Sequence, residues 1–308
     1  MQALIGITTI LLCVFGGFVL HGGDLGVIWQ PVELVIIIGA GAGTIILGNP
    51  RHVLSEMWLQ VKAVLGRRKD GQEFQRQLLL LMYELLQTAA GGLKALDAHV
   101  EAPHESELFK RYPMILHEPK LLHFIVDNFR LMAMGKISSH ELEGVLEQEI
   151  ESIHDEMSQP ARSLGKVGDA MPGFGILAAV LGIVMAMKSV ASGADTGEVA
   201  IAVAAAMVGT FIGIFMCYGV LDPISNRMRQ LVDDERMALD SVKVVLVTHV
   251  AGKPPLLAID AGRRLVQLST KPSFARLEGW IDKLRNPDEL EEPATPRRRK
   301  GDLRAQQA

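Results

Sequence analysis

Side chains able to do chemistry are scarce in the two most apolar stretches of the chain, Met171 to Met187 and Val199 to Leu221. Neither stretch contains a charged residue, and Thr210 is the only hydroxyl in the middle of either one. A hydroxyl inside a membrane helix either bonds to the carbonyl four residues earlier or faces a hydrated path. Thr210 is therefore a candidate path residue, with bonding inside its own helix as the alternative.

The usual catalytic and metal-binding patterns are missing from the sequence. Its two cysteines, Cys13 and Cys217, lie in apolar runs, where each is interpreted as a small buried hydrophobe. Neither His104-Glu105 nor His140-Glu141 is followed by the second histidine of a zinc-protease helix. We therefore predict a protein that is not an enzyme and that binds no metal and no organic cofactor.

The two apolar stretches are each long enough to cross a membrane once their flanks are counted, since about 20 apolar residues span the hydrocarbon layer. The short link from Lys188 to Glu198 predicts a transmembrane hairpin. Small residues share one face of each helix, a pattern that lets backbones approach closely in lipid. Two interpretations stay open: packing within one bundle, or a wall around a partner helix or an ion path. The residues are Pro172, Gly175, Ala179 and Gly182 on the first helix and Ala205, Gly209 and Gly213 on the second.

Two further apolar runs stand near the start of the chain, Ala3 to Leu20 and Val32 to Leu47. The first lacks the basic region and the cleavage site of a secretory signal, so it is interpreted as a retained span. The second carries Glu33 near its start. The favoured interpretation places this acid at the level of the lipid headgroups, and a functional carboxylate is the alternative.

Basic residues indicate the orientation of these four runs. They follow the second and fourth runs and are nearly absent from the two short links, so both termini are predicted to be cytoplasmic. With 49% hydrophobic residues and a mean hydropathy of +0.24, the predicted fold class is an all-α integral membrane protein with four transmembrane helices. The net charge of −4 argues against a nucleic-acid partner.

Changes of composition along the chain predict its organisation. The capping box Ser138-Ser139-His140-Glu141 predicts a helix to about Met157 whose acidic face is either solvated or a docking surface for a basic partner. The predicted segments are spans 1 and 2 with a short periplasmic loop (1–48), a helical cytoplasmic domain (49–168), spans 3 and 4 (169–223), a cytoplasmic C-terminal helical segment (224–285) and a disordered tail (286–308).

Several short motifs, in one order along nearly the whole chain, resemble the MotA family of flagellar motor stator proteins. A single motif would not be specific, but several separated ones in the right order are. They are Trp29–Leu34, Leu96–Pro103, Glu105–Phe109, Val167–Ile176, Val208–Phe211 and Lys271–Phe274.

The resemblance implies a torque generator of the bacterial inner membrane that is driven by protons. Members of this family form a pentameric ring around a dimer of MotB, a single-span partner that is anchored to peptidoglycan and carries an essential aspartate. The third and fourth apolar runs of this chain contain no acid. Their composition fits a channel whose titrating group is supplied by a MotB-like partner.

The resemblance also assigns roles within the path. Pro172 and Pro223 would shape it and transmit a conformational change, because a proline leaves a carbonyl without its helical donor and permits a kink. A helix start is the alternative for Pro172. Sodium-driven relatives carry a threonine at the position of Ala179, so the methyl group here favours protons as the coupling ion.

Contact with the rotor is the remaining implied role. The family engages the rotor switch protein FliG through one acidic and one basic residue. The acidic position falls on Asp97, one methylene shorter than the usual glutamate, and the basic position falls near the uncharged Ala89. Lys94 is the nearby candidate for the missing basic charge.

Two alternatives belong to other classes. An energiser of outer-membrane transport that resembles ExbB or TolQ would use a similar ring, but it would generally have three spans and no Lys271–Phe274 motif. A secondary transporter would show internal repeats with broken helices, which this sequence does not.

Overall fold

Helices make up all the regular structure that the computed structural model describes, which covers residues 2–66, 70–135 and 137–285. The all-helical fold class is confirmed for these residues. The predicted tail 286–308 lies outside them.

The chain divides into two compact units, which are described separately. Unit 1 comprises Met1–Gly71 and His140–Asp240, and unit 2 comprises Gln72–Ser139 and Ser241–Ala308. These units are not the predicted segments, whose bounds at residues 168 and 223 lie inside α10 (Ser139–Ala191) and α12 (Asp222–Val250).

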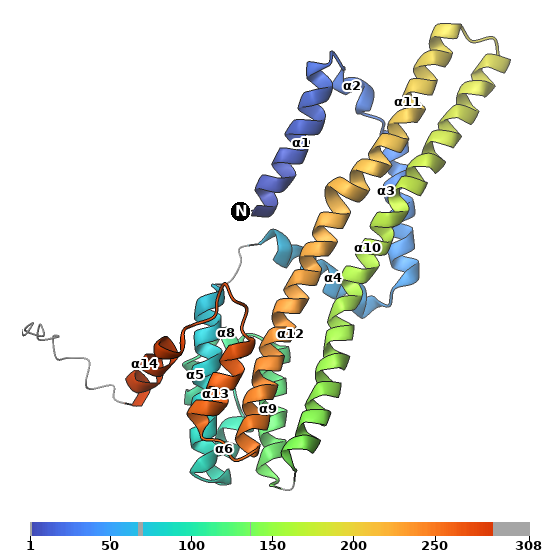
Figure 1. The fold of residues 1–308 in the computed structure, drawn as a ribbon. Coiled ribbons are helices and arrows are strands. Elements are labelled where there is room, and N and C mark those ends of the chain that lie inside the picture. Colours follow the sequence, from blue (N-terminus) through green and yellow to red (C-terminus); the bar gives the residue numbers. More distant parts are fainter. Residues whose placement is uncertain (1, 67–69, 136, 286–308) are drawn as a thin grey trace, which may run out of the picture. The chain divides into compact units, whose positions relative to one another are not determined.

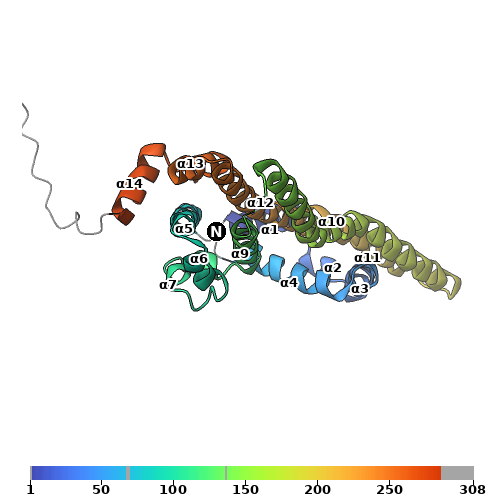
Figure 2. The same ribbon diagram turned by 90° about the horizontal axis from the view of Figure 1, so that it is seen from below.

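Unit 1 contains the apolar helices. The antiparallel pair α10 and α11 is its longest feature, and α3 lies against α11 (Figures 1 and 2). The elements are α1 (Gln2–Leu20), α2 (Leu25–Ile28), α3 (Pro31–Gly48), α4 (Arg51–Leu65), α10 (Ser139–Ala191), α11 (Thr196–Phe215), the π-helix η1 (Met216–Leu221) and α12 (Asp222–Val250), of which α10 and α12 continue into unit 2 at one end.

Three helices in the described residues are long and apolar enough to cross a membrane. They are α3, α10 and the continuous helix Thr196–Val250, and Ile5–Leu20 adds a shorter apolar helix. A helix whose apolar surface is largely exposed needs lipid or another protein to cover it. The chain is therefore a membrane protein.

The turn between α10 and α11 is tighter than the predicted link. Helix α10 ends at Ala191, and Gly193 follows with φ +87°, a conformation that favours glycine. The amide of Ala194 donates to the carbonyl of Ser189 at 3.1 Å and that of Gly193 to Val190 at 3.0 Å. This is a Schellman cap, and it begins the chain reversal that the residues between Ala191 and Thr196 complete.

Helix α10 departs most from its prediction. The helix predicted to end near Met157 continues to Ala191, with Pro160 and Pro172 inside it. The interpretation of Pro172 as a helix start is therefore wrong. Buried residues adjoin both prolines, Ala161 beside Pro160 and Met171 beside Pro172, so packing within unit 1 holds the helix together there, which the local sequence does not indicate.

Unit 2 is built around α5, whose residues Leu78 to Tyr83 are all buried and so surround the helix with neighbours. Its largest fully buried side chains include Phe109, Phe124 and Phe129. The helices are α5 (Gly71–Ala90), α6 (Leu93–Val100), α7 (Glu107–Lys110), α8 (Pro113–Leu116), α9 (Pro119–Ala133), α13 (Pro255–Leu265) and α14 (Phe274–Arg285).

Candidate functional site

The face between α10 and α11 is a backbone-to-backbone contact made possible by glycine. A methyl group added at Gly175 would lie 2.7 Å from the carbonyl oxygen of Gly209 and 3.1 Å from Cα of Gly213. One added at Gly213 would lie 2.6 Å from the carbonyl oxygen of Met171. The small-residue faces of the two helices therefore pack against each other within one chain, as the first of the two open interpretations states.

The same contact continues along the pair towards the turn between α10 and α11. A methyl group added at Gly182 would lie 2.8 Å from Cβ of Ala206. The structure thus pairs Gly182 with Ala206, the neighbour of the predicted Ala205.

Ala179 and Thr210 both have backbone atoms in this contact. Ala179 is buried, and its backbone nitrogen lies 3.4 Å from a methyl group built at Gly209. Thr210 is half-buried, and its Cα approaches Gly175 in the same way at 3.2 Å. The two candidate path residues therefore lie within one turn of each other along the α10–α11 pair.

The hydroxyl of Thr210 is not held by its own helix. Thr9 and Thr44, in the other apolar helices, donate to the carbonyls four residues earlier at 2.8 and 2.9 Å. Within the described residues no such bond is made by Thr210. Its hydroxyl thus keeps both its donor and its acceptor capacity for another group.

Pro172 and Pro223 lie at two irregular places in the long helices. Pro172 lacks the N–H that would donate to the carbonyl of Gly168, and a methyl group built at Gly168 would lie 3.3 Å from Cβ of Leu221, the last residue of η1. Pro223 follows η1 as the second residue of α12. The π-helix and a proline therefore adjoin each other, a combination that permits bending.

Glu33 is a candidate functional residue, and its burial differs from the favoured prediction. Its side chain is 9% exposed, although a place among the headgroups predicts an exposed one. Its Oε2 atom is buried and has no hydrogen-bond partner among the described residues. A buried polar atom without a partner is uncommon in folded proteins.

The predicted rotor residues belong to unit 2. Asp97 is exposed on α6, and Ala89 is half-buried near the end of α5. Lys94 also lies on α6, but its side chain is outside the described part of the structure.

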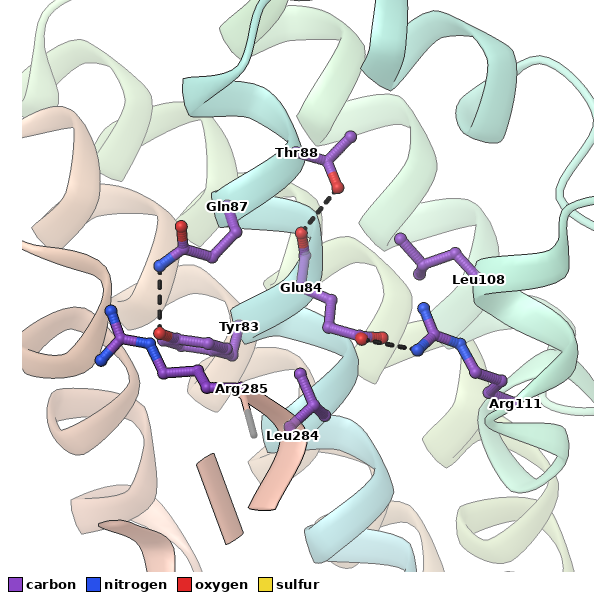
Figure 3. Close-up of a pocket in the computed structure, with 8 residues that line it drawn as sticks. All are labelled: Tyr83, Glu84, Gln87, Thr88, Leu108, Arg111, Leu284 and Arg285. Atoms are coloured by element: carbon purple, nitrogen blue, oxygen red, sulfur yellow. Dashed lines mark hydrogen bonds and ion pairs between the residues drawn. The ribbon is translucent and has the colours of Figure 1, made fainter. Parts of the chain in front are cut away.

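Close to Ala89, a cavity of about 270 Å³ contains a cluster of charged residues that sequence reasoning missed (Figure 3). Glu84, with a side chain 11% exposed, pairs with Arg111 at 2.7 Å and accepts a hydrogen bond from the Tyr112 hydroxyl at 2.9 Å. Burial raises the pKa of Tyr112, and Glu84 beside it adds to the rise. No sequence pattern connects α5 to the residues around 111, so only the fold reveals this cluster.

Arg285 adds a second guanidinium at this cavity (Figure 3). It makes no ion pair among the described residues and is exposed. Arg111 and Arg285 therefore supply positive charge near Ala89, where the sequence alone shows none.

The acidic face of α10 is mostly exposed, and part of it is paired inside unit 1. Arg162 lies 2.7 Å from Asp155, and Arg236 lies 3.5 Å from Glu151. Among the described residues no three His, Cys, Asp or Glu side chains are placed to hold a metal ion.

Comparison with known proteins connects these features to a family. Residues 4–92 match the motility protein A N-terminal family, and residues 119–241 match the MotA/TolQ/ExbB proton channel family. The chemotaxis protein LafT of Vibrio parahaemolyticus is 52% identical over 285 residues, covering 91% of this chain and 98% of LafT. Motility protein A of Salmonella typhimurium is 38% identical over 290 residues, covering 94% and 98% of the two chains.

Solved structures share the fold. The MotAB structure of C. jejuni matches with a TM-score of 0.69 at 18% identity, covering 88% of this chain and 98% of the other. The flagellar MotAB stator complex of Bacillus subtilis matches with a TM-score of 0.63 at 22% identity, covering 90% and 98%.

The fold and the α10–α11 pair thus define a helical membrane protein of the proton channel class. Within that class the chain belongs to the motility protein A family. It is a flagellar motor stator subunit, and the ExbB- or TolQ-like alternative is set aside, since the relatives named motility protein A match it over nearly its whole length.

Proposed function

We propose that this subunit conducts protons together with a MotB-like partner and converts their flow into torque on the rotor. The single observation that carries the proposal is the continuity of α10. One helix carries both the uncharged stretch Met171–Met187 and the acidic stretch from Glu141 to Glu156. A change of packing in the apolar stretch can therefore be passed along one continuous helix.

The proposed arrangement in the membrane has four spans. These are α1, α3, the outer half of α10 and α11 with η1, and unit 2 and both termini are cytoplasmic. The basic residues after α3 and after η1 support this orientation by the positive-inside rule. The membrane is the bacterial inner membrane.

Protons are the proposed coupling ion. The partner's aspartate takes up a proton while it is buried against the face around Pro172, Ala179 and Thr210. Neutralising a buried charge removes a large desolvation cost, so the preferred packing of the ring against the partner changes. Sodium would need several oxygen ligands to replace its water, and the methyl group of Ala179 offers none.

The proposed assembly is a pentamer of this chain around a MotB-like dimer. Its steps act on FliG through Asp97 and a basic group, for which Lys94 is the sequence candidate. Moving one charge through 100 mV supplies about 2.3 kcal/mol, so sustained torque needs many protons.

Swimming assays test the coupling. In a motile host that lacks its own copy of this subunit, Pro172→Leu and Pro223→Leu should abolish swimming while flagella still assemble. Pro119→Leu, at an exposed first position of α9, is the matched control and should swim normally. Normal swimming of both test variants would contradict the role of the two prolines.

The ion and the rotor contact need separate assays. Swimming should stop with a proton uncoupler and should not depend on the sodium concentration; the opposite result would contradict proton coupling.

Asp97→Lys should weaken torque and be partly rescued by charge reversal on FliG, whereas the exposed control Glu105→Lys should not respond to that reversal.

A further inference from the structure

Glu33 is buried on the one face of α3 that packs into unit 1. Glu33, Ile37 and Gly41 are the buried residues of this helix, and their spacing of four places them along one face. Ile37 belongs to a core cluster with Met171, and Gly41 contacts the Met171 side chain. The Glu33 side chain is thus directed towards the α10–α11 pair and not towards lipid.

Two contacts further along α3 determine the level of Glu33 along α10. Gly41 lies against Met171, and eight residues further along α3 the Asn49 side chain accepts a hydrogen bond from Ser163 at 2.5 Å. Ser163 precedes Met171 by the same eight residues, so the two helices run antiparallel in constant register. Counting eight residues the other way from Gly41 brings Glu33 level with Ala179.

The apolar helices that pack against Glu33 bring no other ionisable group to this level. Helix α10 has none between Asp169 and Lys188, and α11 has none from Val199 to Met216. Just before α2, the Asp24 carboxylate is occupied as the helix cap and accepts from the Gly26 amide at 2.8 Å. Cys13 on α1 is exposed, and Cys217 lies in the core cluster around Ile37.

We propose that Glu33 is a proton-intake site, which takes a proton from the outer side and delivers it at the level of Ala179. This inference rests on the proposed proton conduction. An O–H bond forms on Glu33 with a proton from outer water. It breaks when the proton passes to the aspartate of the MotB-like partner, which leaves the Glu33 carboxylate ready for the next proton.

The geometry supports a transport role over a structural one. A structural buried carboxylate has hydrogen-bond donors around it, because leaving one unpartnered costs free energy. Glu33 Oε2 has no donor among the described residues, and Thr210, with its uncommitted hydroxyl, lies about one turn further inward. An acid that keeps a free oxygen inside the spans is a functional group by default.

Proton flux through the complete complex with its partner, reconstituted in vesicles under an imposed pH gradient, tests the proposal. Glu33→Gln keeps the shape and removes the proton-binding oxygen, so flux should fall about a hundredfold, the lower end for a positioned proton-transfer group. Glu33→Asp should conduct, with a changed dependence of flux on outer pH. Glu198→Gln, an exposed carboxyl at the outer start of α11, is the matched control and should equal wild type.

The outcomes separate this inference from the function on which it rests. Wild-type flux in Glu33→Gln would overturn the intake role while leaving proton conduction intact. If Glu33→Gln does not assemble, Glu33→Asp decides, because a pH dependence identical to wild type would also overturn the role. A wild-type complex that carries no protons would instead contradict the proposed function itself.

Discussion

Two nearly buried glutamates, one in each unit, differ in their hydrogen-bond partners. Each carboxylate oxygen of Glu84 in unit 2 has a partner, Arg111 for one and the Tyr112 hydroxyl for the other. Glu33 of unit 1 keeps one buried oxygen without a partner. Two carboxyl groups of the same type and similar burial therefore serve different purposes, and the donors around them distinguish a structural group from one kept for transport.

The two units also differ in what fills their interiors. Unit 2 fills its interior with large side chains such as Phe109, Phe124 and Phe129. The centre of unit 1 is a glycine contact between α10 and α11, which brings backbones together and leaves little side-chain volume to be rearranged. The interior of unit 2 is thus filled by side chains, whereas the centre of unit 1 is formed by two helix backbones that meet at glycines.

The largest expected effect tests the side-chain core of unit 2. Phe124→Ala deletes a ring that is 1% exposed and should cost about 3–5 kcal/mol of unfolding free energy through lost burial and the cavity left behind. Thermal unfolding of the purified protein measures it. His123→Ala, exposed on the same helix, should change little, and an equal loss in both variants would mean that α9 is not packed as described.

A somewhat smaller effect is expected at the glycine contact of unit 1. Gly175→Ala places a methyl group against the backbone of Gly209, which cannot move aside as a flexible side chain would, so about 1–3 kcal/mol should be lost. Gly173→Ala is the matched control, because a methyl group there meets no atom within 4 Å. Equal stability of the two variants in thermal unfolding would contradict the close approach of α10 and α11.

Much of this fold could be predicted from the sequence, since apolar runs and helix punctuation are local signals. Gly91-Gly92 separates α5 from α6, Pro254-Pro255 starts α13, and Lys271–Phe274 precedes α14. The error at α10 has a physical cause. A proline inside a helix costs stability locally, so Pro160 and Pro172 favour breaks, and only packing along the whole helix outweighs that preference.

The site was predictable only in part. Small-residue spacing indicates which faces of α10 and α11 meet, but not that Gly182 meets Ala206. The pairing of Glu84 with Arg111 joins residues from different helices, and the level of Glu33 depends on the register of α3 against α10. Such long-range contacts have no local sequence signal, so they follow only from the folded chain.

Replacing each of the two glutamates by leucine tests the comparison directly. Glu33→Leu removes a buried carboxyl that lacks a partner, so it should raise the free energy of unfolding, measured by thermal unfolding, by about 1–3 kcal/mol. Glu84→Leu should lower it by a similar or smaller amount, because Tyr112 loses its acceptor while the exposed Arg111 remains solvated. A fall in both variants would mean that Glu33 has donors comparable to those of Glu84.

The smallest effect expected is at Tyr112, where the saturated cluster of unit 2 can be followed with pH. Tyr112→Phe removes one hydrogen bond to Glu84 and should cost about 1 kcal/mol at neutral pH.

Because the pKa of Tyr112 is raised in the folded chain, the unfolded state loses the phenol proton of Tyr112 first as pH rises. The stabilisation is therefore complete below the usual tyrosine pKa of about 10 and is lost above it. Wild type should lose stability above that pH more steeply than Tyr112→Phe, whereas Tyr218→Phe, at an exposed tyrosine, should follow the wild-type curve. Parallel curves for wild type and Tyr112→Phe would show that the phenol does not bond to Glu84. Glu84 would then not be the fully hydrogen-bonded carboxylate with which Glu33 is compared.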